Sequence, residues 1–278
     1  MTAAPPHVAI ANHKGGVGKT AVAQGLTVAA AEAGHRVLAI DMDSQGNLTR
    51  RLRAQVSTDP DARQKASLAS VLQRPGRGEI ERILVPSGYG GIYTDRIQIA
   101  PAHLDLELLP RTAAEAASER RLLRALAGVV DDFDLVIIDC PPNLLSHQID
   151  VAWTATDVIL MPCEGEYEAV EAARRIKERV SADRHTLNPE LAVAGMVVSR
   201  YRQSLAVHRK RVGEMEKIVG PDGICPTRIP ELVAFKKMSE NARPIGECGP
   251  EGRQMEFIFK DVYEWTRNRI ETVMKDAA

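Results

Sequence analysis

The segment that most constrains the fold of this chain is a glycine-rich stretch at residues 12–20, with the sequence NHKGGVGKT. It follows an apolar run at 7–11 that is typical of a short buried strand, and it precedes an alanine-rich segment at 21–33 that favours a helix. A strand, a glycine-rich turn and a helix in this order present free backbone N–H groups and a positive helix N-terminus, which together bind phosphate oxygens. The sequence therefore predicts a phosphate-binding loop.

Two lysines and a threonine in this loop are candidate nucleotide contacts. Lys19 is expected to reach the β- and γ-phosphates, and the Thr20 hydroxyl to ligate Mg²⁺. The usual G-x-x-x-x-G-K-[ST] pattern would place glycine where this chain has His13, and Lys14 follows it. Lys14 is then either a second cation beside the same triphosphate or one directed at a neighbouring subunit's triphosphate. The alternative, a glycine-rich turn with incidental lysines, is disfavoured by the flanking strand and helix.

Acidic residues end two further predicted strands. The strand expected at 36–40 leads to Asp41 and Asp43, and the strongly apolar strand expected at 133–139 ends in Asp139. Ligands of open α/β sheets bind at the carboxyl ends of the strands, so Asp139 is expected to hold Mg²⁺ through water. One of Asp41 and Asp43 could belong to the Mg²⁺ shell while the other positions the attacking water. In isolation this pair could equally lie in a solvated turn.

Three motifs resemble those of the ParA/MinD family of P-loop ATPases. The sequence KGGVGKT at 14–20 resembles the family's deviant Walker A motif, D-x-D-x-Q at 41–45 its second motif, and D-x-P-P at 139–142 its Walker B segment. The resemblance implies that Lys14 reaches across an ATP-sandwiched dimer to the partner's nucleotide. It also implies that Asp43 orients the hydrolytic water, which leaves Asp41 for the metal.

The resemblance extends from Val8 to about Ile245 and includes T-x-I-P at 227–230, which borders the adenine in the family. Glu164 occupies a position where the family usually has glutamine, in a loop at the dimer interface, so its added charge is expected to alter subunit contacts. The ATP-binding residues implied are Lys14, Gly15, Gly16, Val17, Gly18, Lys19, Thr20, Ala21, Ile229 and Pro230. Lys14, Lys19 and Asp43 are the implied catalytic residues, and Thr20, Asp41 and Asp139 the implied metal ligands.

Basic residues cluster locally, although the formal net charge is only −1. Five of the twelve residues from 200 to 211 are arginine or lysine, which indicates either a solvated helix start or a patch for the phosphate backbone. In DNA-binding members of the family, arginines after this strand contact DNA without sequence preference, which favours the second interpretation. The arginines between 50 and 53, by contrast, favour a solvated face. The candidate DNA contacts are Arg200, Arg202, Arg209, Lys210, Arg228, Lys236, Lys237 and Arg243.

The resemblance implies a single doubly wound α/β domain spanning 1–278, with a mainly parallel sheet and no N-terminal helix-turn-helix extension. The four cysteines are widely separated and are expected to be reduced thiols. No secretory signal and no run of 18 apolar residues is present, so we expect a soluble cytoplasmic protein. The resemblance implies that it associates with the nucleoid. Further strands are expected at 97–101, 157–162 and 191–198. Helices are expected at 68–72, 115–127 and 255–275, and another helix, which follows the strand at 157–162, is expected to end near residue 180.

The resemblance also implies what the protein does. It implies ATP and Mg²⁺ as cofactors, slow hydrolysis of ATP to ADP and phosphate, an ATP-dependent homodimer, and non-specific binding of double-stranded DNA. A ParB-type centromere-binding partner would stimulate hydrolysis during plasmid or chromosome segregation. One alternative is the same ATPase positioning a protein cargo on the nucleoid. A second alternative is a MinD-like membrane-cycling ATPase, which the nearly balanced charges of the last helix disfavour. A third is an iron–sulfur reductase of the nitrogenase iron-protein type, which the cysteine spacing disfavours.

Overall fold

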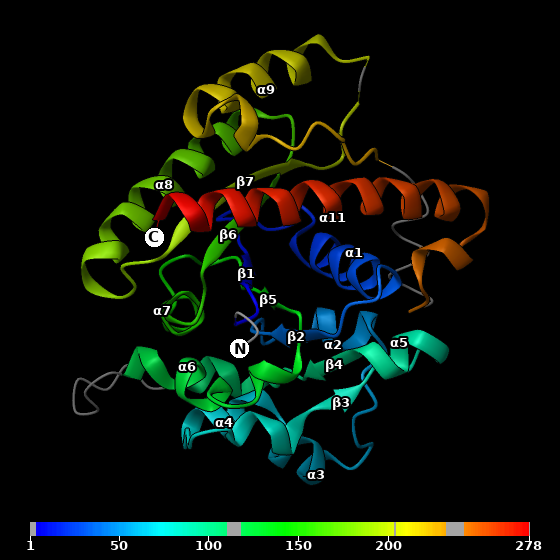
Figure 1. Cartoon of the computed structure of the whole chain (residues 1–278), viewed down its shortest axis with the longest axis vertical. Coiled ribbons are helices and arrows are strands. Elements are labelled where there is room, and N and C mark those ends of the chain that lie inside the picture. The colour runs from blue at the N-terminus through cyan, green and yellow to red at the C-terminus, as the bar shows by residue number, and fades with distance from the viewer. Residues whose placement is uncertain (1–3, 110–117, 203, 232–241, 278) are drawn as a thin grey trace.

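A seven-stranded sheet forms the centre of the computed structural model, in the order β3-β4-β2-β5-β1-β6-β7 (Figure 1). The structure describes residues 4–109, 118–202, 204–231 and 242–277. All neighbouring strands are parallel except β3 and β4, which are antiparallel. The strands are β1 (His7–Ile10), β2 (Val37–Asp41), β3 (Val85–Pro86), β4 (Ile97–Ala100), β5 (Leu135–Asp139), β6 (Val158–Cys163) and β7 (Ala192–Val198).

The parallel strands are apolar because helices cover both faces of the sheet. In β5, Leu135 and Ile137 join one hydrophobic cluster, whereas Val136 and Ile138 join the cluster on the opposite face. Alternate side chains of a strand point to opposite faces, so the unbroken run of aliphatic residues supplies both cores at once. This is why the strongly apolar segment is a central strand.

Helices form the two outer layers. On one face lie α1 (Lys19–Glu32), α2 (Asn47–Arg51), α5 (Gly91–Arg96) and α11 (Gly249–Ala277). On the other lie α4 (Leu68–Gln73), α6 (Arg121–Leu126), α7 (His147–Thr154), α8 (Tyr167–Thr186) and α9 (Ala206–Val219). The helix α3 (Pro60–Lys65) buries none of its residues. Short 3-10 helices are η1 (Glu79–Ile83), η2 (Leu104–Leu108), η3 (Ser118–Arg120), η4 (Val130–Asp132), η5 (Pro221–Gly223) and η6 (Ile245–Glu247).

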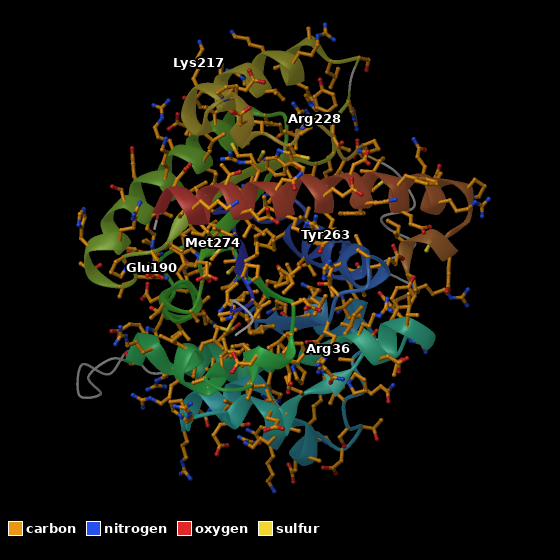
Figure 2. The ribbon with its side chains drawn as sticks, viewed as in Figure 1. Arg36, Glu190, Lys217, Arg228, Tyr263 and Met274 are labelled. Carbon is orange, nitrogen blue, oxygen red and sulfur yellow. The ribbon has the colours of Figure 1, made fainter. Side chains whose placement is uncertain are left out.

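The long helix α11 crosses α1 and the strands β6 and β7 (Figure 1). Gly25 of α1 allows this close approach, since a Cβ there would lie 2.2 Å from the ring of Phe259. Tyr263, labelled in Figure 2, is also buried on this helix. The apolar side of α11 is therefore occupied by the domain itself. Within the described ranges, no helix is long and apolar enough to cross a membrane.

The predicted fold class is confirmed, with differences at particular elements. The predicted helix at 115–127 falls partly outside the described residues, and the remainder is the short η3 followed by α6. Gly128, with φ of 87°, closes that segment two residues after α6 ends. The antiparallel edge strand β3 and the helix α7 were not predicted. No disulfide joins the cysteines among the residues that the structure describes.

Candidate functional site

The loop between β1 and α1 has the backbone shape of a phosphate-binding loop. Gly16 and Gly18 have φ of 81° and 88°, a left-handed conformation that costs energy for residues with a Cβ. Gly18 is also the N-cap of α1, so the first N–H groups of that helix open toward the loop. A Cβ built on Gly15 or Gly16 meets no atom within 4 Å, which leaves space on this side of the loop.

Side chains from distant segments fasten the loop to the sheet. The Asn12 Nδ2 donates to the Pro162 carbonyl at 2.6 Å, while its Oδ1 accepts from the Lys14 backbone N–H at 3.0 Å. At the other end, the Ser199 hydroxyl donates to the Val17 carbonyl at 2.7 Å. The loop is thus tied to the ends of β6 and β7 before any ligand binds, which reduces the entropy that binding must remove.

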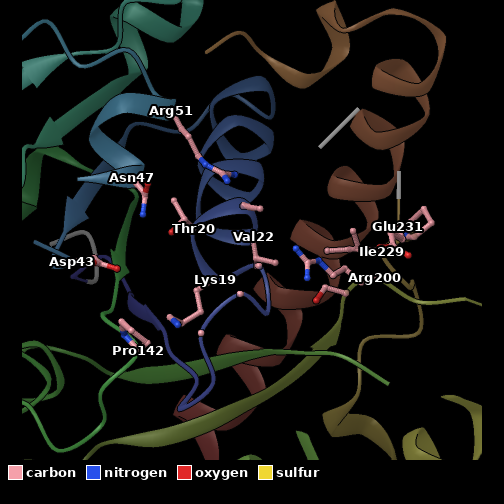
Figure 3. Close-up of a pocket in the computed structure, with 16 residues that line it drawn as sticks. Lys19, Thr20, Val22, Asp43, Asn47, Arg51, Pro142, Arg200, Ile229 and Glu231 are labelled. Atoms are coloured by element: carbon pink, nitrogen blue, oxygen red, sulfur yellow. The ribbon is translucent and has the colours of Figure 1, made fainter. Parts of the chain in front are cut away.

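A cavity of about 450 Å³ opens beside the loop (Figure 3). It lies at the carboxyl ends of the strands, as expected for an open α/β sheet. Most of the predicted loop residues line it, together with Asp43, Arg200 and the segment 229–231. Its lining residues are Gly15, Gly16, Gly18, Lys19, Thr20, Ala21, Val22, Asp43, Asn47, Arg51, Pro142, Ser199, Arg200, Ile229, Pro230 and Glu231.

Lys19 is a buried cation at the cavity wall, with 8% of its surface exposed. Its Nζ donates to the Lys14 carbonyl at 3.3 Å. Burial lowers the pKa of Lys19, and the nearby carboxylate of Asp139 acts against that shift. A bound polyanion would replace the solvation that this ammonium group has lost.

Two buried carboxyl groups lie side by side under the loop. Parallel pairing of β2 and β5 places Asp41 directly opposite Asp139, and both are fully buried. The Oδ2 of Asp41 accepts from the backbone N–H and the hydroxyl of Thr49, each at 2.7 Å. No donor within 3.5 Å bonds its Oδ1 or either oxygen of Asp139 in the part of the chain that the structure describes, and the nearby Thr20 hydroxyl acts to lower the pKa of Asp139.

These orphaned oxygens fit a divalent cation. Burial raises the pKa of Asp41 to about 7, and burial together with the charge of Asp41 raises the pKa of Asp139 well above its usual range. Mg²⁺ prefers carboxylate, hydroxyl and water oxygens, and its charge would offset the cost of holding two carboxylates together. Thr20 and Asp43 line the adjoining cavity, but Asp41 and Asp139 lie beneath it.

Lys14, in contrast to Lys19, does not line the cavity. Its Nζ lies 2.7 Å from an oxygen of Glu166 and 3.3 Å from one of Glu164. The other oxygen of Glu164 accepts from Arg200 at 3.0 Å. The hydrogen bond from Lys14 lowers the pKa of Glu166, and the same bond raises the pKa of Lys14. Both groups are therefore charged near neutral pH.

The structure distributes the predicted DNA contacts over several surfaces. Arg200 lines the cavity, and Arg202 forms an ion pair with Glu231 at 2.5 Å. Arg209 and Lys210 are exposed on α9. Arg228 is half-buried between α9 and α11 (Figure 2), and Arg243 is exposed just before η6. Lys236 and Lys237 lie outside the described residues.

Four polar residues of the cavity, Asn47, Arg51, Ser199 and Glu231, were not predicted. Asn47 and Arg51 belong to α2, and the sequence had indicated a solvated face for the arginines between 50 and 53. Ser199 follows β7, and Glu231 follows Pro230. The segment around Asn47 does carry a signal, because it follows the strand that ends at Asp41. The inward orientation of Arg51 depends on tertiary contacts, so no local pattern indicates it.

The fold and the site together define a P-loop nucleotide-binding protein. The defining features are the central parallel sheet, the glycine-rich loop, the buried lysine at the start of α1 and the carboxylates on adjacent strands. A family model described as an AAA domain matches residues 6–193. The chain belongs to the ParA/MinD-type P-loop ATPases.

Two named relatives support this membership. The sporulation initiation inhibitor protein Soj of Bacillus subtilis is 30% identical over 258 residues, which covers 92% of this chain and 95% of Soj. The chromosome partitioning protein ParA of Caulobacter vibrioides is 30% identical over 250 residues, which covers 88% of each chain.

Solved structures show the same fold. An ATP complex of McdA from Cyanothece has a TM-score of 0.80 at 21% identity and covers 95% of this chain and 97% of its own. Cobyrinic acid a,c-diamide synthase of Mycobacterium smegmatis with ADP and magnesium has a TM-score of 0.68 at 29% identity, covering 86% and 92%. A putative plasmid partition protein of Borrelia burgdorferi bound to AMPPNP has a TM-score of 0.73 at 19% identity, covering 94% and 98%.

Proposed function

We propose that this ParA-type ATPase binds ATP and Mg²⁺, pairs two copies of the chain around ATP, and binds double-stranded DNA without sequence preference as the dimer. Hydrolysis to ADP and phosphate resets the cycle, and a ParB-type centromere-binding protein stimulates it. The biological role is partition of a plasmid or chromosome on the nucleoid in the cytoplasm. The observation that carries the proposal is the presence of two loop lysines with different environments, Lys19 in the cavity and Lys14 on the surface beside it.

The cavity supports triphosphate and metal binding. Lys19 and the open side of the glycine loop offer a cation and backbone N–H groups to phosphate oxygens. Thr20 would contribute its hydroxyl to Mg²⁺, and Asp139 would hold the ion through water. The ion, when bound, neutralises charge that develops on the transferred phosphoryl group. At the other end of the cavity, Ile229 and Pro230 provide an apolar wall suited to the adenine.

Asp43 is the proposed water-positioning residue. It lines the cavity, and its Oδ1 accepts the Gln45 backbone N–H at 3.0 Å. This bond fixes the carboxylate while leaving its second oxygen available to a water molecule. Lys19 would stabilise negative charge on the phosphoryl oxygens as the bond to the leaving group lengthens.

The position of Lys14 supports the proposed dimerisation. Its ammonium group is outside the cavity of its own chain, with 36% of the side chain exposed, so it is accessible to a second copy. If it contacts the partner's triphosphate, ATP becomes part of the interface, and removal of the γ-phosphate weakens it. DNA binding would then depend on nucleotide because pairing doubles the number of basic side chains on one assembly.

The central test is DNA retention measured with ATP, with ADP and without nucleotide, with oligomeric state followed by sedimentation. We expect a dimer and DNA binding only with ATP. Lys14→Ala should abolish ATP-dependent dimerisation while nucleotide binding remains, whereas Lys260→Ala, which removes an exposed lysine of α11, should change neither. Asp43→Ala should trap an ATP-bound dimer on DNA. Nucleotide-independent DNA binding, or dimerisation unchanged by Lys14→Ala, would contradict the proposal.

The DNA surface can be tested separately through its salt dependence. Lys210→Gln removes one exposed charge on α9, and we expect the slope of log K against log salt to fall by about 1. Lys65→Gln on α3, which lies at the opposite end of the molecule in Figure 1, is the matched control. Equal slopes for both variants would remove α9 from the DNA surface. ATP-dependent sedimentation with liposomes instead of DNA would favour the membrane-cycling alternative.

A further inference from the structure

Arg51 is a half-buried cation that forms no ion pair with any residue that the structure describes. It is the last residue of α2, and it lines the cavity together with Thr20, Ala21 and Val22 of α1. Its Nε and Nη1 are buried and have no hydrogen-bond partner within the described part of the chain. In Figure 3 the side chain runs from α2 toward the first turns of α1. Burial lowers the pKa of Arg51, and the charge of Asp139 opposes this shift.

The other cations at the cavity have partners within this chain. Lys19 donates to the carbonyl of Lys14, and Arg200 pairs with Glu164 at 3.0 Å. An unpaired buried guanidinium group loses its hydration without compensation, so structures rarely keep one unless a ligand completes it. The arrangement of Arg51 therefore indicates that an anion is its missing partner.

The backbone at Arg51 is held in place from outside the cavity. The Gln24 side chain of α1 donates to the Arg51 carbonyl at 3.5 Å and to the Tyr89 hydroxyl at 2.7 Å, and that hydroxyl also donates to the Arg51 carbonyl. These bonds fix the end of α2 against α1 without using the guanidinium group. The charged end of Arg51 is thus positioned in advance and kept available, as expected of a ligand-binding side chain.

We propose that Arg51 binds the phosphate chain of the nucleotide, at the first turn of α1. Position 21 is alanine, so this turn offers no second hydroxyl after Thr20, and the guanidinium group of Arg51 supplies donors to the same region of the cavity. Arginine suits the role because its planar group can donate two parallel hydrogen bonds to phosphate oxygens. This inference rests on the proposed function, and it assigns to the site a residue that the sequence did not indicate.

The test compares Arg51→Met with wild type by calorimetric titration of ATP and ADP. Methionine keeps much of the apolar stem but removes the charge. We expect Arg51→Met to weaken both nucleotides by roughly tenfold or more, the scale of a hydrogen bond to a charged group. Arg51→Lys should recover part of the affinity. Arg53→Met, which removes an exposed arginine two residues away, should bind as wild type does.

Thermal unfolding without nucleotide separates ligand binding from a purely structural role. Arg51→Met should leave the midpoint unchanged or raise it, because no described partner is lost, whereas a structural role predicts a clear fall in the midpoint. Inorganic pyrophosphate supplies the second probe: it should raise the midpoint of wild type and raise that of Arg51→Met much less. Equal shifts would overturn the assignment to phosphate.

The two proposals fail in distinguishable ways. Wild-type protein that binds neither ATP nor ADP would contradict the proposed function. Wild-type protein that binds both, together with an Arg51→Met variant of equal affinity, would overturn only the role of Arg51.

Discussion

Glu164→Gln should strengthen the ATP-dependent dimer. In the single chain, Lys14 is held by Glu166 at 2.7 Å and by Glu164 at 3.3 Å. If Lys14 must reach the partner's triphosphate, these two ion pairs have to break first. The intramolecular pairing then competes with association, and weakening it in the monomer favours the dimer. Glutamine at position 164 removes one of the two competing charges while keeping nearly the same shape.

The exposure of the three groups sets the size of the effect. The side chains of Lys14, Glu164 and Glu166 are 36%, 11% and 50% exposed. The two ion pairs are therefore intermediate between a fully exposed and a fully buried ion pair. A surface ion pair contributes about 0.2–1 kcal/mol, and a hydrogen bond to a charged group about 1.5–3 kcal/mol. We take roughly 0.5–1.5 kcal/mol for the contribution of the ion pair with Glu164, because Glu166 still forms an ion pair with Lys14 in the variant. Both subunits release their lysine, so the dimer gains about 1–3 kcal/mol, which corresponds to a decrease in Kd of roughly 5-fold to 140-fold.

The assay is sedimentation velocity with ATP in an Asp43→Ala background, where turnover is expected to be blocked. Glu168→Gln is the matched control because it removes the same charge from a nearby glutamate, in the first turn of α8. Glu168 forms no ion pair with any residue that the structure describes. Glu164→Gln should lower the dimer Kd and Glu168→Gln should not. A dimer weakened by Glu164→Gln would show that Glu164 receives a cation from the partner, which would refute the competition.

Three further predictions concern the ion pair, the packing of α1 and the buried carboxylates. The effect of Glu166→Gln on dimer affinity should be constant between about pH 6 and about pH 9. The ion pair between Lys14 and Glu166 is lost only when the pH falls through the lowered pKa of Glu166 or rises through the raised pKa of Lys14. Sedimentation across this range measures the effect, and a change within it would mean that another group titrates. Gly25→Ala should lower the free energy of unfolding in urea by about 1–3 kcal/mol, because the new methyl group meets the Phe259 ring, and adding Phe259→Leu should recover part of the loss. Asp139→Asn should raise the thermal midpoint of the nucleotide-free protein, by the equivalent of about 1–3 kcal/mol, because it replaces a buried carboxylate that faces Asp41 by a neutral amide of the same size. It should also abolish the further stabilisation by ATP with Mg²⁺. A lower midpoint would mean that contacts of the carboxyl group stabilise the free protein.

The parts of the fold that rest on local patterns were predictable. The central strand at 135–139 is a run of aliphatic residues that ends in a carboxylate, and only a strand buried on both faces explains such a run. The loop at 12–20 was equally clear, because glycines at 16 and 18 are required where the backbone is left-handed. These signals depend on neighbouring residues alone, so they are visible in the sequence.

The unpredicted parts depend on contacts between distant segments. β3 consists of Val85 and Pro86 only. Two residues are too few to show the alternation of apolar and polar side chains that predicts a strand, so the pairing with β4 was not predicted. The orientation of Arg51 is set by hydrogen bonds from Gln24 and Tyr89, which are far from it in sequence. The sequence also indicated that the charge of Glu164 would matter, but not that it would hold a lysine of its own chain.

The packing of α11 on α1 has a consequence for how the protein is made. Phe259 fills the space beside Gly25, so the helix that starts at the phosphate loop is covered by residues that leave the ribosome long after it. During synthesis α1 has an apolar side open to water until α11 arrives. Chains that stop before this helix would carry the complete loop sequence yet lack its support, and quality-control proteases would meet them as incompletely folded products.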